Sequence, residues 1–466
     1  MSASLRHRLR SIRSRLPSGR TAGRLAFACV VLLASLPLAQ GYAIAAGIGG
    51  IHPTAPPAEN ETVIATQPGH LLLYGENGTL RYDEHRYENY WDVDPSPAGD
   101  RTYCSPRVTD ADAEACSAEE CVRNVVTRVN LTTGERTRLF SRAVSTTGSS
   151  EWHDVDRINE SALLVADIKR DRVFMVDPET EEGLRQWNAS EHFSPESGGP
   201  PDDWIHLNDV EYTANGRVMA DIRNQDQIVF IEPGRSVLAN RTLGAEGDFS
   251  TLRSHHNPDY IPESRGGPAV LVADSHNDRA VEYQLRDNAA SETPRADGSA
   301  VNETWVRTWQ WSDARTQWTR DADRLPGGDT LITDTNGDRV LEVDGSGGIV
   351  WSVSIEKPYE AERLGTGDES ATGKSAAVLG LRSRTGGQTG TTETLYGSAM
   401  RSVWYAITEV APPFALNSAL FVMPKWMGPT ELVPLVVAGL TVLSWLGVEA
   451  YWRFALPAIR TRFEGA

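Results

Sequence analysis

The 466-residue sequence predicts an all-β protein, a six-bladed β-propeller flanked by one transmembrane helix at each end. Three observations lead to this prediction: a tetrapeptide that joins a histidine to an aspartate recurs along the chain, short apolar runs follow each copy, and a long apolar segment lies near each terminus. Recurrence at this period is typical of repeat folds, and four short strands per unit are typical of a propeller.

The recurring tetrapeptide occurs as His153-Asp-Val-Asp156, His206-Leu-Asn-Asp209 and His256-Asn-Pro-Asp259. Two further copies, Arg320-Asp-Ala-Asp323 and Trp91-Asp-Val-Asp94, carry a different residue in place of the histidine. The aspartates that end the copies lie roughly 50 to 64 residues apart, which is room for four strands and their loops. Because equivalent positions of successive blades converge near the axis of a propeller, we expect the three histidines to share one pocket.

Short apolar runs, separated by polar turns, follow the tetrapeptides. They are rich in β-branched residues and are bounded by turn residues, which is typical of strands. About six such units fit into residues 63–410, which we predict to form the propeller. The paired runs are 163–167 with 173–177, 217–221 with 228–232, 270–274 with 280–283, and 330–334 with 340–344.

The N-terminal region combines a basic segment with an apolar one. Residues 1–24 contain seven arginines and no acid, and residues 25–48 contain no charge. An apolar run of this length can span a bilayer. A cleaved signal peptide is the alternative, since Ala43-Ile-Ala45 resembles a cleavage site, but the length of the run favours an anchor.

A second apolar segment lies at residues 430–451, and the tail 452–466 contains Arg453, Arg460 and Arg462. Arginines therefore flank each apolar segment on the side that faces the nearer chain terminus. The positive-inside rule then predicts that both termini are cytoplasmic and that residues 63–410 lie outside the cell. We expect a protein of the cell membrane that contacts the lipid bilayer through two spans.

The charge of the chain is strongly negative, −18 in total, and the segment between the two apolar runs is more acidic still. Such a domain repels phosphate, so nucleic acid is excluded as a partner. Few lysines among many acids favour a halophilic archaeal source. N-glycosylation sequons support an extracellular glycoprotein. They begin at Asn60, Asn77, Asn130, Asn159, Asn188, Asn240 and Asn302.

Three cysteines, Cys104, Cys116 and Cys121, cluster outside the apolar segments. In an extracellular compartment a disulfide between two of them is expected rather than a metal site. Which two are bridged stays open.

The histidines are the candidate catalytic groups. A single histidine before a strand is more often structural, but three in one register can serve as nucleophile, as acid or base, or as metal ligands. Asn208 and Arg223 add hydrogen-bond donors, and the guanidinium of Arg223 can clamp an oxyanion. His255 is out of register, and we expect it to point elsewhere.

Over residues 152–344 the chain resembles the arylsulfotransferase family, in particular its membrane-anchored haloarchaeal type. His206-x-Asn208 followed by Arg223 resembles the sulfate-binding motif, His256 the nucleophilic histidine and His153 a further pocket histidine. The resemblance implies a six-bladed propeller that moves a sulfuryl group from an aryl sulfate to a phenol through a sulfohistidine. It implies no cofactor and no metal.

Two other functions stay open. One is a calcium-dependent propeller hydrolase or lactonase, in which oxygens of axial residues bind the metal; calcium's avoidance of imidazole counts against it. The other is a non-catalytic extracellular propeller that binds glycan or protein, because propellers serve many functions. The candidate calcium ligands are Asp154, Asp209, Asn257 and Asp321.

Overall fold

The protein divides into two compact units, residues 52–391 and residues 1–51 together with 392–466. Each unit is described by itself. The computed structural model describes residues 19–45, 60–95, 101–110, 121–145, 149–234, 236–287, 303–313, 315–385 and 429–455.

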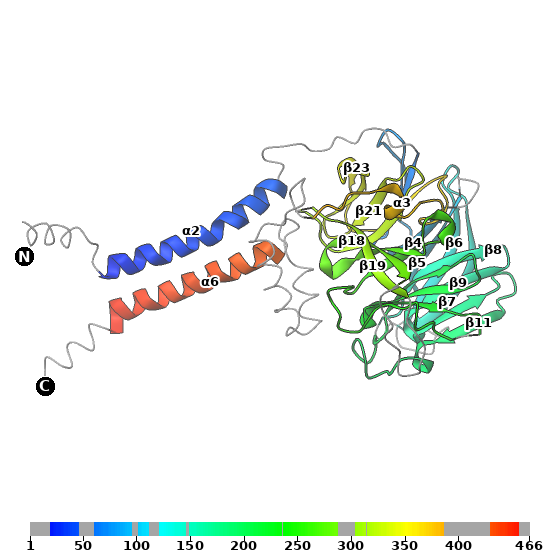
Figure 1. Ribbon diagram of the computed structural model, residues 1–466, viewed down its shortest axis with the longest axis horizontal. Coiled ribbons are helices and arrows are strands. Elements are labelled where there is room, and N and C mark those ends of the chain that lie inside the picture. Colours follow the sequence, from blue (N-terminus) through cyan, green and yellow to red (C-terminus); the bar gives the residue numbers. More distant parts are fainter. Residues whose placement is uncertain are drawn as a thin grey trace, which may run out of the picture. The chain divides into compact units, whose positions relative to one another are not determined.

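The smaller unit contains two helices that lie side by side, α2 (Gly19–Ala45) and α6 (Pro429–Ala450), the latter continued by a π-helical turn to Ala455 (Figure 1). A bidentate ion pair joins Arg24 to Glu449, with Nη2 and Oε2 2.7 Å apart, and Phe27 stacks on Trp445. By length and composition both helices can cross a membrane, and a signal sequence passes the same test.

The larger unit is an all-β, propeller-like arrangement of four-stranded antiparallel sheets, so this part of the prediction is confirmed. Five blades are each built from four consecutive strands. Their strands are β4 (Asn89–Pro95), β5 (Arg101–Asp110), β6 (Cys121–Asn130) and β7 (Arg136–Ser145); β8 (Trp152–Asn159), β9 (Ala162–Asp167), β10 (Arg172–Val176) and β11 (Gly183–Asn188); β12 (Leu207–Tyr212), β13 (Val218–Ile222), β14 (Gln227–Ile231) and β15 (Leu243–Gly244); β16 (His256–Ile261), β17 (Ala269–Asp274), β18 (Arg279–Asp287) and β19 (Glu303–Trp311); and β20 (Thr319–Arg324), β21 (Thr330–Asp334), β22 (Arg339–Val343) and β23 (Ile349–Ser354).

The repeat predicted a six-bladed propeller, whereas the structure has five blades of consecutive strands and differs at the two ends of the propeller segment. There, β24 (Pro358–Arg363) pairs antiparallel with β1 (Thr62–Thr66), which continues to β2 (Leu71–Tyr74) and β3 (Leu80–Glu84). This composite sheet joins the beginning of the segment to its end by hydrogen bonds. The repeat could not indicate it, because its strands come from distant parts of the sequence.

The first strands of the five blades and β24 form a closed ring of neighbours, β4–β8–β12–β16–β20–β24. Outside this ring the middle strands are buried on both faces, as in β9, β17 and β21. Apolar side chains fill the space between neighbouring sheets; one such cluster contains Trp204, Leu164 and Val229. The inner strands are therefore held on a rigid scaffold, and their side chains face one another around the ring.

After β24 the chain forms a short helix, α3 (Ala376–Leu379), and its further course from residue 386 to residue 428 lies outside the described residues. The end of the predicted propeller at residue 410 falls in that part. Cys121 is disulfide-bonded.

Candidate active site

Four of the inner strands are each aligned with the next by a carboxylate oxygen that accepts a hydrogen bond from a backbone N–H of the neighbouring strand. Each distance below joins that carboxylate oxygen to that nitrogen. The pairs are Asp92 with Val155 (3.2 Å), Asp154 with Val210 (2.7 Å), Asp321 with Ala361 (3.0 Å) and Glu360 with Val93 (3.1 Å). Acids two positions further along two of these strands do the same: Asp156 accepts from the backbone N–H of Tyr212, and Glu211 accepts from that of Tyr260, each at 2.6 Å.

These bonds define two layers of equivalent residues. We call the first the carboxylate layer: Asp92, Asp154, Asp209, Asn257, Asp321 and Glu360. The residues immediately before them form the pocket layer: Trp91, His153, Asn208, His256, Arg320 and Tyr359. The pairing register shifts at or beside these residues in all six inner strands, and in β24 the shift falls at Tyr359. Such bulges change the direction in which the side chains of this region point.

The pocket layer is assembled around Tyr359. Its ring centroid lies 5.0 Å from that of Trp91, 5.5 Å from that of His153 and 6.3 Å from that of His256, and the Arg320 guanidinium lies 4.6 Å above it. Trp91 also stacks on His153 at 4.8 Å. Residues from five different sheets therefore meet at one place.

His206 does not occupy the predicted position. Asn208 holds that place in the pocket layer, and His206 lies two residues earlier with φ of +52°. Its ring is nevertheless 5.3 Å from that of His153, and its Nδ1 is 2.7 Å from both carboxylate oxygens of Asp203. The sequence analysis placed His206 in register with His153 and His256 by aligning Asp209 with Asp156 and Asp259. That register was wrong for His206, because Asp209 belongs to the carboxylate layer.

The protonation of His153 follows from its neighbour Asn208. The amide nitrogen of Asn208 donates to the carbonyl oxygen of His255 at 3.1 Å, so its Oδ1 is the atom that faces His153. That oxygen lies 2.9 Å from Nδ1 of His153 and can only accept a hydrogen bond. His153 therefore carries its proton on Nδ1 and leaves Nε2 as a free lone pair. The Tyr359 hydroxyl oxygen, 2.8 Å from the same Nδ1, is then a second acceptor.

The same argument applies to His256. Its Nδ1 lies 3.2 Å from the carbonyl oxygen of Ser254 and 2.7 Å from the hydroxyl of Ser275. A carbonyl oxygen can only accept, so Nδ1 carries the proton and Nε2 is unprotonated. Burial lowers the pKa of His256 and of His153 well below the ordinary value, and the nearby charge of Arg320 lowers both further. Both imidazoles are neutral at neutral pH.

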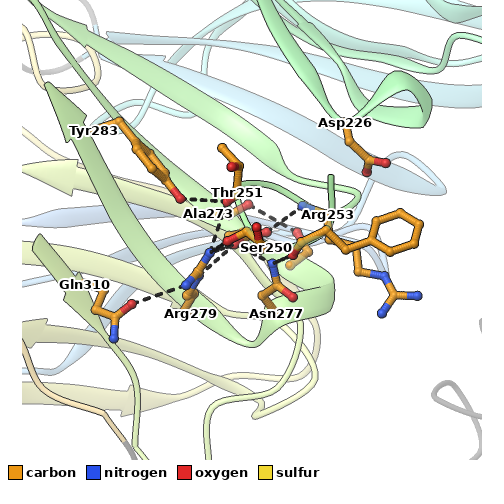
Figure 2. Close-up of polar contacts among 12 residues, drawn as sticks. Asp226, Ser250, Thr251, Arg253, Ala273, Asn277, Arg279, Tyr283 and Gln310 are labelled. Atoms are coloured by element: carbon orange, nitrogen blue, oxygen red, sulfur yellow. Dashed lines mark hydrogen bonds and ion pairs between the residues drawn. The ribbon is translucent and has the colours of Figure 1, made fainter. Parts of the chain in front are cut away.

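Polar contacts hold the loop that leads into β16 in place (Figure 2). The hydroxyl of Tyr283 and Nη2 of Arg279 both donate to the carbonyl oxygen of Thr251, at 2.7 and 3.0 Å. The backbone N–H of Ser254 donates to Asp226 at 2.9 Å. Contacts from two blades thus fix the backbone directly before His256.

Two arginines lie beside these histidines: Arg223, which is buried, and Arg320, which is partly buried. Arg223 begins the short 3₁₀ turn after β13, and its Nη1 donates to Asn224 at 3.1 Å. Burial lowers the pKa of both Arg223 and Arg320, the latter to about 10, so both remain charged at neutral pH. Neutral histidines next to guanidinium groups form a site for an anion.

His255, directly before His256, contacts a buried acid. Its Nε2 lies 3.0 Å from Asp221, and both side chains are fully buried. Burial lowers the pKa of His255, but the charge of Asp221 outweighs this, so the pKa is raised overall. His255 thus has a structural ion pair under the pocket.

Several residues of this region were missed as site residues in the sequence: Arg320, Tyr359, Trp91, and a further pair, the buried His276 and the partly buried Trp318, whose rings are 4.9 Å apart. A signal for Tyr359 was available. Tyr359-Glu-Ala-Glu362 matches Trp91-Asp-Val-Asp94 in having two acids, one residue apart, after an aromatic residue.

A possible metal site lies in the carboxylate layer and the next layer of acids. One oxygen each of Asp92, Asp94 and Glu360 lie within 4.8 Å of one another, and all three residues are buried. Carboxylate oxygens suit calcium. These are not the four residues predicted as calcium ligands, although all of them lie on inner strands.

Comparison with known proteins agrees with part of this picture. A family model for arylsulfotransferase (ASST) matches residues 165–356, less than half of the chain. The match contains His206, Asn208, Arg223 and His256, whereas His153 and Tyr359 lie outside it. No curated protein matches the chain.

Similar solved structures include a protein of unknown function from Bacteroides caccae, with 12% identity and a TM-score of 0.43, covering 66% of this chain and 98% of that one. A putative 6-phosphogluconolactonase from Bacteroides fragilis has 12% identity and a TM-score of 0.40, with 65% and 98% covered. The periplasmic gluconolactonase of Pseudomonas aeruginosa has 14% identity and a TM-score of 0.41, with 66% and 99% covered. Likenesses of this size decide nothing about function.

Proposed function

We propose that this protein is a sulfotransferase that moves a sulfuryl group from an aryl sulfate ester to a phenolic acceptor through a sulfohistidine on His256. One observation carries the proposal: the Nδ1 of His256 faces two acceptors, which leaves Nε2 with the lone pair, and the charges of Arg320 and Arg223 act on this neutral ring. A neutral imidazole is a competent nucleophile, and the arginines attract an anionic ester. The ASST match over residues 165–356 supports this assignment.

The first step forms one bond and breaks one. Nε2 of His256 attacks sulfur, the bond between sulfur and the aryl oxygen breaks, and that oxygen leaves with the electron pair. The leaving phenolate takes a proton from water, which leaves hydroxide. In the second step an incoming phenol gives its proton to that hydroxide, its oxygen attacks sulfur, and the bond between sulfur and Nε2 breaks, which frees the neutral imidazole.

The remaining predicted residues line the site of the sulfuryl group. Arg223 provides a guanidinium that donates to the sulfuryl oxygens, His206 and Asn208 lie beside it, and His153, whose Nε2 has a lone pair, packs against them. The hydrogen bond between Asn208 and His153 supports a positioning role, since it orients the ring that faces the substrate. Such fixed donors stabilise charge that builds up in the transition state.

The test is the intact mass of the full chain after incubation with 4-nitrophenyl sulfate in high salt. The expected result is a mass gain of one sulfuryl group that a phenol removes and that His256→Ala never shows. A matched control is His192→Ala, because His192 stacks on Trp187 at a different place in the fold. A wild-type protein that releases nitrophenol without any mass gain contradicts the sulfohistidine.

We further propose a six-bladed propeller, residues 63–410, in which the composite sheet of β24 and β1–β3 is the sixth blade. Residues 25–48 and 430–451 would span the membrane, with residues 1–24 and 452–466 in the cytoplasm, in a glycoprotein of a halophilic archaeon. The apolar composition of α2 and α6 supports the spans. Protease added to intact cells should digest the propeller and spare both ends; a protected propeller reverses the orientation.

A second candidate, a calcium-dependent hydrolase or lactonase, is favoured by the buried group of Asp92, Asp94 and Glu360. A single metal bound there would polarise an ester carbonyl. This function would require the metal for turnover and would not require His256, so the two candidates predict opposite results for a chelator and for His256→Ala.

A further inference from the structure

Arg320 is a charged side chain without a carboxylate partner in the interior of the propeller. Among the described residues its Nε and Nη1 have no hydrogen-bond partner, and no ion pair includes it. Its close contacts are aromatic: the guanidinium lies 5.6 Å from the Trp318 ring and 4.6 Å from the Tyr359 ring. An isolated buried charge is costly, so an occupant that neutralises it would be bound strongly.

Other buried arginines of the same unit are paired with acids. Arg324 on the same strand lies 3.2 Å from Glu282, Arg339 lies 2.7 Å from Asp334, and Arg363 lies 2.5 Å from Glu342. These ion pairs hold the blades together. Arg320 differs from them, which indicates that its charge does not serve the packing of the fold.

Arg223 also differs from Arg320. The nearby carboxylates of Asp203 and Asp221 act on its charge, whereas no carboxylate acts comparably on Arg320. Arg223 therefore has carboxylates near it, although Asp203 also contacts His206 and Asp221 also contacts His255. With His153 and His256 neutral, the spare positive charge of the pocket layer is that of Arg320, which forms no ion pair among the described residues.

We propose that Arg320 is the principal anion-binding residue of this pocket and that it selects monoanionic sulfate esters. The proposal rests on the proposed function, and it adds a residue and a selectivity to it. Arg320 and His256 approach the same ring, Tyr359, so a sulfuryl group beside Nε2 of His256 can accept N–H donors from the guanidinium. A sulfate monoester carries one negative charge and matches the spare positive charge, whereas the dianion of a phosphate monoester exceeds it.

Stability separates this role from a structural one. Replacing an unneutralised buried charge by a neutral side chain removes a cost, so Arg320→Gln should fold and should melt no lower than the parent protein. Arg324→Gln is the matched control, because it removes a buried arginine four residues away but leaves Glu282 without its partner. We expect the melting temperature to fall only in Arg324→Gln.

The experiment measures binding of 4-nitrophenyl sulfate by calorimetry to the full-length chain carrying His256→Ala, in which the donor is not consumed. Adding Arg320→Gln should weaken binding about 100-fold, Arg320→Lys should weaken it less, and Arg324→Gln should leave it unchanged. In the same protein 4-nitrophenyl phosphate at pH 8 should bind more weakly than the sulfate, and Arg320→Gln should affect it less.

Unchanged sulfate binding in Arg320→Gln overturns the proposal, and so does a fall in melting temperature that matches the loss of binding. Equal affinity for the phosphate ester overturns the selectivity. These outcomes are distinct from failure of the proposed function. If binding depends on Arg320 but His256 gains no mass, the anion site is supported and the sulfotransferase function is contradicted. If His256 gains mass but binding does not depend on Arg320, the function is supported and the role of Arg320 is contradicted.

Discussion

The pocket layer and the carboxylate layer are adjacent positions on the same six strands, and their compositions differ sharply. The carboxylate layer has acids in all strands except β16, where Asn257 takes the place. The pocket layer has tryptophan, histidine, asparagine, histidine, arginine and tyrosine. The uniform layer repeats one task, bonding an inner strand to the next, at four of its six positions, whereas the varied layer surrounds a single site with five kinds of side chain. Repetition therefore indicates architecture, and departure from repetition indicates function.

Burial moves the two layers toward neutrality from opposite directions. It lowers the pKa of His153 and His256, and it raises the pKa of acids such as Asp154 and Asp321. Both shifts follow from the cost of a charge in a low-dielectric interior. Arg320 is an exception, because a guanidinium does not lose its proton at neutral pH and so keeps a charge in the pocket.

The largest effect should come from the nucleophile. His256→Ala should abolish sulfuryl transfer, because no covalent intermediate can form. Steady-state transfer from 4-nitrophenyl sulfate to a phenol measures this, with circular dichroism to check the fold. Residual transfer in His256→Ala at a few per cent of the parent rate would assign the nucleophile to another group, and Nε2 of His153 is the next candidate.

Arg223→Ala should lower kcat/KM about 100-fold, because charge that develops on the sulfuryl oxygens loses a donor. Its control is Arg217→Ala in the same blade, which removes an arginine paired with Glu232 at the surface, 2.8 Å away. We expect the control to keep full activity. Equal losses in both variants would mean that Arg223 acts only through the stability of the blade.

His255→Ala should act on stability instead of chemistry. It leaves Asp221 buried without its partner, which typically costs about 3 kcal/mol of the free energy of unfolding. Chemical denaturation measures this loss, and the double variant His255→Gln with Asp221→Asn should recover much of it. A large loss of kcat with unchanged stability would instead place His255 in the reaction.

The pH dependence of stability should reflect the carboxylate layer and the acids beyond it. Burial raises the pKa of Asp156 and Asp321 to about 7. In the folded protein these groups hold protons that the unfolded chain has released, so stability is fully present below the unfolded pKa near 3.8 and is lost as pH rises through about 7. The melting temperature in a chelator should therefore rise from pH 8 to pH 6.5.

Below pH 6.5 the buried histidines oppose this gain, because the lowered pKa values of His153 and His256 favour protonation of the unfolded chain. The increase should thus level off at lower pH. A melting temperature that falls between pH 8 and pH 6.5 would mean that the buried acids are ionised and compensated in the folded protein.

The smallest expected effect is that of metal removal. A chelator should leave sulfuryl transfer unchanged, since the proposed chemistry uses the histidine and the arginines. The measurement is transfer activity before and after dialysis against chelator, followed by addition of calcium. Loss of activity that calcium restores, with activity retained in His256→Ala, would favour the metal-dependent hydrolase.

Much of the architecture was predictable from local patterns. Alternation of short apolar runs with turn residues predicted the strands of blades such as β16–β19, because strand formation depends on nearby residues and on burial of both faces. The apolar segments predicted the regions of α2 and α6 for the same local reason. The composite sheet was not predictable in this way, since pairing of β1 with β24 depends on closure of the whole ring.

For the candidate site, the amino-acid sequence by itself determined which chemical groups the inner strands carry and that His153, His256 and Arg320 recur in one register. Only the tertiary structure decided that Asn208, and not His206, holds the equivalent position, that Tyr359 joins the pocket from the far end of the propeller, and that Arg320 forms no ion pair within the part of the chain that the structure describes. The physical reason is that register shifts at bulges and neighbours across the ring are set by long-range packing. Spacing along the chain cannot specify either of them.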